Sequence, residues 1–351
     1  MTATFAARVA LTLLLALSAA LLCRWLRVPL PWMLGPLLGT ALASIIGFPT
    51  RSFSPFRNAG QAIIGTALGL YFTPQVTALV AGIWWAIVIA IVWALAVGWG
   101  FGLWLHRSEG ERIGGTERER RATSFFAGAI GGASEMTLLA EREGARTELV
   151  AASHSLRMLI VTLVIPFAAT AAGLHGMDVT LPGAREVRWG GLVVLFIGGL
   201  TSSWLMERTG RANPWFIGAL VFSMGLTMAG FEPSAMPQWA SSMAQLLIGV
   251  SLGVRFSGEF VRTAPRWLLA VSLGTLGMIV VCALFAVVLA KAAGLNWATL
   301  ILGTSPGGIT EMAITAKALQ LGVPVVTAFQ VCRLIAVLVL VEPLYRKGFL
   351  R

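Results

Sequence analysis

The chain has 351 residues, of which 57% are hydrophobic and only 12% are charged, and its mean hydropathy is +0.82. Soluble proteins carry about 25% charged residues, so the composition excludes an ordinary soluble domain and indicates a polytopic helical membrane protein. The formal net charge is +11. The basic residues stand in short stretches between apolar segments, which favours cytoplasmic loops beside a lipid bilayer over a surface for nucleic acid.

Apolar segments follow one another along the chain, and about 20 helical residues are needed to cross a bilayer. The first follows Arg8 and ends near Cys23 in a poor signal-peptide cleavage sequence, so we expect a transmembrane helix there. In chain order the segments span residues 6–25, 30–48, 58–72, 76–105, 123–141 and 147–174, then 188–206, 213–231, 241–256, 265–293, 298–317 and 323–345.

The two halves of the chain repeat each other. Pro31-Trp32-x-x-Gly35 returns as Pro214-Trp215-x-x-Gly218, and Gly65-x-x-Leu68-Gly69 returns as Gly249-x-x-Leu252-Gly253. The second pair suggests close approach between helices. Such self-similarity indicates duplication. We place a first membrane repeat at residues 1–176 and a second at 177–351, which together form one integral membrane domain.

Two glycine-rich cassettes stand 176 positions apart, Gly131-Gly132-Ala133-Ser134-Glu135-Met136 and Gly307-Gly308-Ile309-Thr310-Glu311-Met312. A carboxylate inside membrane sequence costs about 2.5–3.5 kcal/mol on insertion scales and is a functional-site candidate. Glycine permits a turn, Ser134 or Thr310 can cap a helix that starts there, and the glutamate suits its first turn. We therefore expect a broken helix in each cassette segment.

Arg157 and Arg333 stand in the segment after each cassette, three residues beyond His154 and Gln330 on the same helix face. Each buried guanidinium needs a partner, either a cassette glutamate or an anionic substrate. The predicted substrate- and ion-binding residues are Gly131, Gly132, Ser134, Glu135, His154 and Arg157 in the first half, and Thr304, Ser305, Gly307, Gly308, Thr310, Glu311, Gln330 and Arg333 in the second.

Three alternatives remain open for these residues. The arginines can form fixed ion pairs with the glutamates that only hold the fold. The cassettes can be ordinary packing helices with glutamates near the lipid headgroups. His154 is either a proton relay or a satisfied core histidine. The scattered histidines and cysteines have no ligand spacing, so neither a metal nor another cofactor is predicted.

The distribution of Lys and Arg distinguishes parallel from inverted repeats. If all twelve segments cross the membrane, the basic residues divide almost evenly between its two sides. If each cassette segment dips in and returns, most of them share the side of both termini, as the positive-inside rule requires. We therefore expect an all-α polytopic protein of two inverted repeats, each with about five spanning helices plus one broken or re-entrant segment, and cytoplasmic termini.

The Pro-Trp-x-x-Gly segments, the first cassette and Thr304-Ser305-Pro306-Gly307-Gly308-Ile309-Thr310-Glu311-Met312 resemble the AbrB membrane-protein family. The resemblance covers nearly the whole chain. Automatic labels call this duplicated module an ammonia monooxygenase or a regulator. The family is similar in turn to the cation/proton antiporter and anion transporter superfamily, which implies inverted repeats and broken crossing helices.

These features predict a secondary transporter or exporter of a small anionic or zwitterionic solute in a bacterial inner membrane, with Glu135 and Glu311 binding a coupling proton or sodium ion. The alternative is a non-transporting protein that regulates gene expression through a cytoplasmic partner docked on the charged loop His106–Arg121. A monooxygenase comes last, because a metal site needs clustered ligands, and we expect no enzyme. Homo-oligomers are left open.

Overall fold

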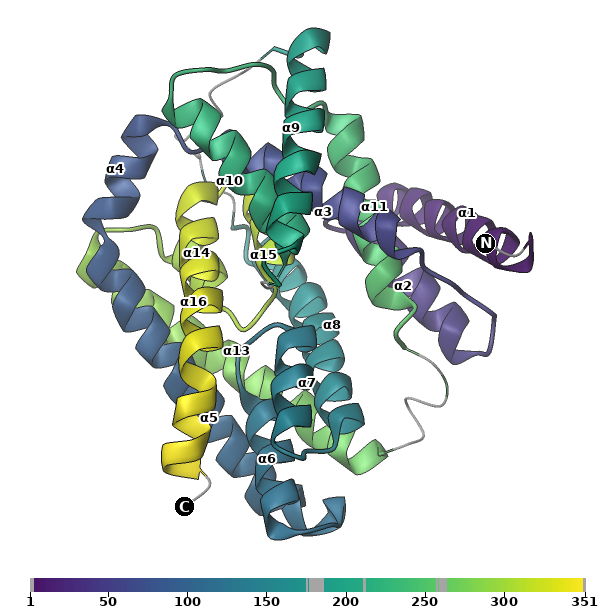
Figure 1. The fold of residues 1–351 in the computed structure, drawn as a ribbon, viewed down its shortest axis with the longest axis vertical. Coiled ribbons are helices and arrows are strands. Elements are labelled where there is room, and N and C mark those ends of the chain that lie inside the picture. Colours follow the sequence, from purple (N-terminus) through teal and green to yellow (C-terminus); the bar gives the residue numbers. More distant parts are fainter. Residues whose placement is uncertain are drawn as a thin grey trace. The chain divides into compact units, whose positions relative to one another are not determined.

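The computed structural model describes residues 3–174, 176, 186–210, 213–256, 258 and 264–349, without the side chains of Ala3, Thr4 and Ser134. The described residues form helices and no strand, which confirms the predicted all-α class. In chain order the helices are α1 (Ala3–Trp25), α2 (Pro31–Ile45), α3 (Ser54–Gly69), α4 (Pro74–Gly82), α5 (Trp84–Ile113), α6 (Glu117–Gly128), α7 (Ala133–Arg142), α8 (Thr147–Ala171), α9 (Trp189–Glu207), α10 (Pro214–Met228), α11 (Gln238–Gly253), α13 (Pro265–Ala293), α14 (Trp297–Thr304), α15 (Ile309–Ala318), α16 (Val323–Leu344) and the π-helical turn η1 (Tyr345–Phe349) (Figure 1).

Six described helices are long and apolar enough to cross a membrane: α1, α5, α8, α9, α13 and α16, the last extending through η1. There are seven candidate spans if α3 and α4, which meet at a bend of 89°, count as one broken span. Both cassette segments are broken at their glycines, as predicted. Each segment forms two half-helices, α6 with α7 and α14 with α15.

The predicted loop His106–Arg121 is wrong. Helix α5 continues to Ile113 and α6 begins at Glu117, so only a short turn with two left-handed glycines separates them. Arg and Glu are good helix formers, and here they pair one turn apart, as Glu109 does with Arg112 (2.9 Å). The charged residues of this stretch therefore stabilise the end of α5 and the start of α6, and they do not form a loop.

The chain folds as two compact units, and neither of them is one half of the sequence. The first unit contains Met1–Gly82, Pro166–Val261 and Ala313–Pro324, and the second contains Ile83–Ile165, Arg262–Met312 and Val325–Arg351. Each unit therefore combines corresponding segments of both halves. The repeat boundary at residue 176 concerns duplication in the sequence and stays a prediction.

Glycines hold the first unit together where helices from the two halves cross. In this unit α3 packs on α10, and α11 packs on α2. A β-carbon on Gly65 would lie 2.3 Å from the carbonyl oxygen of Phe216, and one on Gly249 would lie 2.6 Å from that of Met33. The two crossings correspond position by position, and the predicted role of these glycines in close packing is confirmed.

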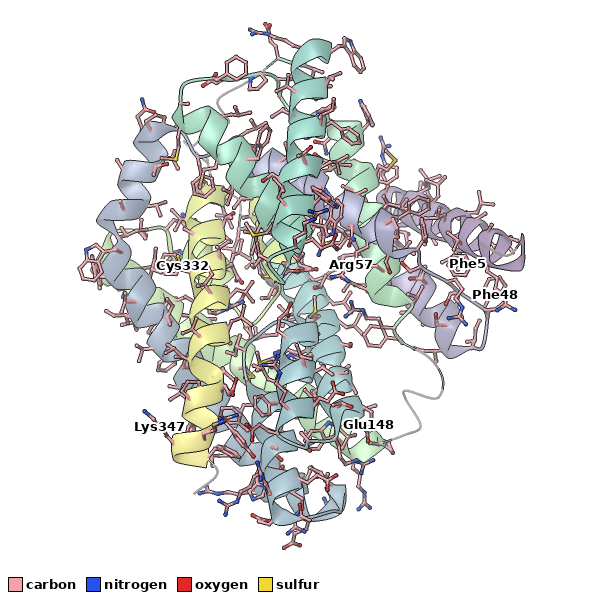
Figure 2. All side chains as sticks on the ribbon, in the orientation of Figure 1. Phe5, Phe48, Arg57, Glu148, Cys332 and Lys347 are labelled. Atoms are coloured by element: carbon pink, nitrogen blue, oxygen red, sulfur yellow. The ribbon has the colours of Figure 1, made fainter. Side chains whose placement is uncertain are left out.

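The second unit contains both cassettes and the breaks at which they lie, whereas the rest of α15 after Met312 belongs to the first unit. In the second unit α5 packs on α6 and α13, α13 packs on α14, and η1 packs on α6. An aromatic cluster joins α6 to the end of the chain, because Phe126 lies 5.1 Å from Tyr345 between ring centroids and Phe125 lies 4.9 Å from Phe349. Charged side chains gather at the end of this unit that carries Glu148 and Lys347 (Figure 2).

We expect Gly249→Ala and Gly65→Ala each to lower the free energy of unfolding by about 1–3 kcal/mol, because the added methyl group overpacks a backbone contact. Gly225→Ala is the matched control, since a β-carbon on Gly225 meets nothing within 4 Å. It should leave stability unchanged or raise it by up to about 1 kcal/mol. Unfolding in detergent micelles measures the effect, and equal stability of all three variants would contradict the assignment.

Candidate functional site

Each cassette lies in the second unit, at a break between two half-helices. Helix α6 ends at Gly128 and α7 begins at Ala133, while α14 ends at Thr304 and α15 begins at Ile309. A helix end leaves up to four carbonyls or four N–H groups without helical partners. Inside a membrane protein these groups must find partners in the protein or in a cavity. The question at each break is therefore which side chains act as partners for these backbone groups.

Arg157 supplies the donors for the end of α6. Its Nη1 donates to the carbonyls of Ala127 and Gly128, both at 3.3 Å, and its Nη2 donates to that of Ala129 at 2.8 Å. The side chain is buried. Hydrogen bonds to a charged donor contribute about 1.5–3 kcal/mol each, and a cation also suits the negative end of a helix dipole.

Arg333 does the same at the second break. Its Nη1 donates to the carbonyl of Ser305, and its Nη2 donates to that of Gly307 at 2.8 Å. Arg157 and Arg333 are 176 positions apart, as are Ala129 and Ser305, so the two copies share this one arginine–carbonyl contact. The Nε of Arg333 is buried and has no hydrogen-bond partner among the described residues.

His154 and Gln330 hold the two guanidiniums in place by the same pair of contacts. His154 Nε2 lies 2.8 Å from the carbonyl of Phe126, and its Nδ1 lies 2.7 Å from Nη2 of Arg157. Gln330 Nε2 donates to the carbonyl of Leu302 at 2.7 Å, and its Oε1 accepts from Arg333 at 2.6 Å. An amide makes both contacts without charge, and the imidazole makes them as the neutral Nε2–H tautomer. His154 is therefore a satisfied core residue.

The cassette glycines make room for the cassette glutamate and methionine. A β-carbon on Gly132 would lie 2.0 Å from Oε2 of Glu135, and one on Gly308 would lie 2.0 Å from Oε2 of Glu311. Each carboxylate thus folds back over the residue that precedes its half-helix. The first glycine of each cassette faces the methionine in the same way, since β-carbons on Gly131 and Gly307 would meet the side chains of Met136 and Met312 at 2.8 Å and 3.0 Å.

The predicted capping role of Ser134 and Thr310 is wrong. Gly132 is the N-cap of α7, and Gly308 accepts the first helical hydrogen bond of α15, so both residues fall inside the first turn. The backbone at Gly132 is extended, and the carboxylate of Glu135 lies where a side chain at this position would be. Glu135 and Glu311 do lie in the first turns, as predicted. The side chain of Ser134 lies outside the described residues.

Two further predicted residues, Thr304 and Ser305, form hydrogen bonds with the helix that precedes the second break. Thr304 Oγ1 donates to the carbonyl of Leu300 at 2.9 Å, and Ser305 Oγ donates to that of Leu302 at 3.0 Å. Both hydroxyls therefore bind α14 itself in this structure. Their predicted part in binding a solute stays a prediction.

The structure gives Arg157 and Arg333 polar contacts with backbone carbonyls, His154 and Gln330. Glu311 is buried and Glu135 is half-buried, and both stand in the first turn of the second half-helix of their break. The alternative of fixed ion pairs between the arginines and the cassette glutamates stays a prediction.

The first cassette segment is a hairpin that returns to its starting end. At the start of α6, Arg118 lies 3.2 Å from the carboxylate of Glu143, which follows the end of α7. Thr123 of α6 accepts a hydrogen bond from the backbone N–H of Arg146 at 2.9 Å. Figure 1 shows α6 and α7 side by side. The first cassette segment therefore folds back on itself, and its re-entry into a membrane stays a prediction.

Helix α8 brings the two half-sites to one place. It carries Arg157 for the first break, and it also lies against the second cassette. A β-carbon on Gly307 would lie 2.9 Å from Val161, and one on Gly308 would lie 3.4 Å from Met158. Buried cations in a membrane protein pair with anions or carboxylates.

Sequence reasoning missed several residues that shape the site. Thr116 caps α6 by accepting from the N–H of Glu119 at 3.2 Å, and Asn296 caps α14 by accepting from that of Ala298 at 2.8 Å. The Thr-x-x-Glu pattern was a readable capping-box signal. Buried Glu143 had no such signal, because its partners, Arg118 and Arg346, are distant in sequence.

The helices and the two breaks define an integral membrane protein of transporter-like build. The sequence profile of the AbrB family, described as "Transition state regulatory protein AbrB", matches residues 32–348, and the chain belongs to this family. It is 26% identical to "Uncharacterized protein YhjN" of Bacillus subtilis (strain 168), over 91% of this chain and 87% of the relative. It is also 26% identical to "Putative regulator AbrB" of Escherichia coli (strain K12), over 93% and 92% respectively.

His154→Gln should keep the free energy of unfolding within about 0.5 kcal/mol of the parent, because Gln330 already fills the equivalent place. His154→Leu should lower it by about 1–3 kcal/mol, because it leaves the Phe126 carbonyl and one Arg157 N–H unpaired. Thermal unfolding in detergent compares the two variants. If both lose the same stability, the hydrogen-bonding role of His154 fails.

Glu143→Gln should open the hairpin ends, because buried Glu143 also accepts from Arg346 at 2.9 Å on η1. We expect faster amide hydrogen exchange at the start of α6 and the end of α7, and a loss of about 1–3 kcal/mol. Glu148→Gln is the control, since Glu148 pairs with Arg146 at an exposed position, where a pair contributes about 0–1 kcal/mol. Equal exchange in both variants would contradict the hairpin link.

Proposed function

We propose that this protein is a secondary transporter or exporter that moves a small anionic or zwitterionic solute by alternating access, coupled to a proton or a sodium ion. The observation that carries the proposal is the pair of helix breaks in one compact unit, each with a buried arginine at one half-helix and a glutamate at the other. Secondary transporters hold substrate and coupling ion at such breaks.

The charges of the two half-sites suggest how coupling would work. Arg157 and Arg333 are balanced by Glu135 and Glu311 only while both carboxylates are ionised. A proton or sodium ion on either glutamate leaves an excess positive charge, which an anion compensates. Binding of cation and anion would then favour each other, and such coupling is reciprocal. The role of the arginines would be to fix the site potential, since their Nη groups already bind carbonyls.

Orientation belongs to the same proposal. A re-entrant first cassette, with most basic residues on the side of both termini, supports inverted repeats and cytoplasmic ends in a bacterial inner membrane. Corresponding contacts in the two halves support a two-fold relation between them. Lipid, the solute and the coupling ion are the partners that we propose, without nucleic acid or a cofactor. Self-association would place no residue in the half-sites.

The regulatory alternative draws its support from the name of the Escherichia coli relative. It needs a docking surface, and the charged stretch expected for this purpose is helical. Several of its charges pair within the chain, as Glu117 does with Arg121 at 2.8 Å and with Arg120 at 2.8 Å. The monooxygenase alternative needs a metal. Among the described residues no group of three His, Cys, Asp or Glu side chains lies close enough to hold one, and we propose no enzymatic activity.

Glu311→Gln should abolish coupled transport while the protein stays folded, because the amide cannot take up a proton or balance the arginines. A thermal-shift screen of small carboxylates and amino acids, at acidic and neutral pH with and without sodium, identifies the solute through the stabilisation that ligands produce. Uptake of that solute into proteoliposomes should then fall by more than about tenfold, or about 1.4 kcal/mol.

Glu141→Gln is the control, since Glu141 is exposed on α7 and stands five residues after Met136, the last residue of the cassette. It should transport like the parent. Full uptake by the Glu311→Gln variant would refute the coupling role. A regulator without transport would instead show no solute-dependent stabilisation in the screen and no uptake by any variant.

A further inference from the structure

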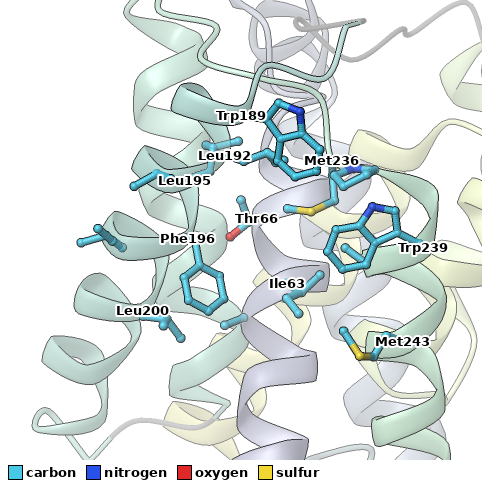
Figure 3. A pocket seen from close by; sticks show the side chains of 15 residues that line it. Ile63, Thr66, Trp189, Leu192, Leu195, Phe196, Leu200, Met236, Trp239 and Met243 are labelled. Atoms are coloured by element: carbon cyan, nitrogen blue, oxygen red, sulfur yellow. The ribbon is translucent and has the colours of Figure 1, made fainter.

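The first unit has an apolar groove that the transport proposal does not use. It has a volume of about 450 Å³ and lies between α3, α9 and α11. Figure 3 shows Thr66 of α3 in its floor, with Trp189 and Phe196 on one wall and Trp239 and Met243 on the other. Trp189, Phe196 and Trp239 are all exposed, so the groove opens to the surroundings of the protein.

The dimensions of the groove fit one hydrocarbon chain from one leaflet. Its wall on α9 runs from Trp189 to Leu200, which spans about 16 Å at the rise of an α-helix. The hydrocarbon core of a bilayer is about 30 Å thick, so one leaflet contributes about half of that. A groove of this length, lined by apolar side chains apart from Thr66, matches an acyl chain better than a polar solute.

One end of the groove carries the marks of a membrane interface. Trp189 is the first residue of α9 and Trp239 is the second of α11, and tryptophan is enriched at the headgroup level. Arg188 immediately precedes Trp189 as the N-cap of α9, and it is exposed, as is Glu186. A cation and an anion side by side complement a zwitterionic headgroup, with Arg188 binding the phosphate and Glu186 the ammonium group.

The first half of the sequence has aromatic side chains at the equivalent positions. Pro237 and Ala240 line the groove, and at the offset of 184 their counterparts are Phe53 and Phe56. The rings of these two phenylalanines lie 5.1 Å apart, and Phe53 also lies 6.3 Å from Phe5. The duplicated helices therefore have aromatic side chains in one copy where the other copy leaves a groove.

We propose that this groove is a binding site for a phospholipid of the phosphatidylethanolamine class, with one acyl chain along α9 and the headgroup at Arg188 and Glu186. The site lies wholly within the first unit and is independent of the cassettes. It would fix the first unit to one leaflet.

A phosphatidylethanolamine with a photoactivatable acyl chain tests this in vesicles of phosphatidylethanolamine and phosphatidylcholine. Irradiation and peptide mapping should place adducts on the groove residues of α9 and α11, above the level on exposed Leu269 of α13. Ala240→Phe, which copies Phe56, should reduce the groove adducts by about tenfold. Val193→Phe fills the same groove from an exposed position on α9. It takes the place of Ala240→Phe in the experiment if that variant fails to fold.

Val194→Phe is the matched control, because Val194 is also exposed on α9 but does not line the groove. It should label like the parent. Arg188→Ala should reduce labelling by about fivefold, as loss of one basic residue at a lipid surface does, and a phosphatidylglycerol probe should label less than phosphatidylethanolamine. Adducts that neither filling variant reduces overturn the proposal, and so do protein–protein cross-links at these residues in place of lipid adducts.

Discussion

The constraint on which this structure depends is the need to satisfy helix ends inside a membrane protein. Two helices are interrupted at glycines, and each interruption leaves carbonyls that lipid cannot bind. Arg157 and Arg333 meet that need from the neighbouring helices α8 and α16. A guanidinium is suited to it, because one group offers several donors in a fixed plane. Everything near the two breaks is arranged around those donors.

This constraint also explains which residues are left for chemistry. His154 and Gln330 are used to orient the arginines, and each does so as a neutral group. The difference between them is therefore a change of side chain with the same contacts. The glutamates lie at the opposite ends of the breaks, in the first turns of α7 and α15. They are the acidic side chains of the two cassettes, which is why the proposed coupling rests on them.

Duplication explains the architecture, and divergence explains its special features. Corresponding helices meet at Gly65 and Gly249 with equivalent partners, and both arginines bind the carbonyl at one equivalent position, Ala129 or Ser305. Against this background the differences are informative. Glu143 ties the first hairpin to η1, whereas its counterpart at an offset of 176 is Leu319. Ala240 leaves a groove where its counterpart is Phe56.

The sequence by itself determined the all-α membrane class, the broken cassettes and the close-packing glycines, because hydropathy, glycine pairs and repeated spacing are local signals. It misjudged the stretch His106–Arg121, where helix propensity and ion pairs outweighed polarity. Only the tertiary structure decided that Arg157 and Arg333 bind the carbonyls at the helix breaks, that α6 and α7 form a hairpin, and that each compact unit combines both halves. Those outcomes depend on atoms from distant segments meeting in space, and a pattern along one chain does not state which partner a buried donor will reach.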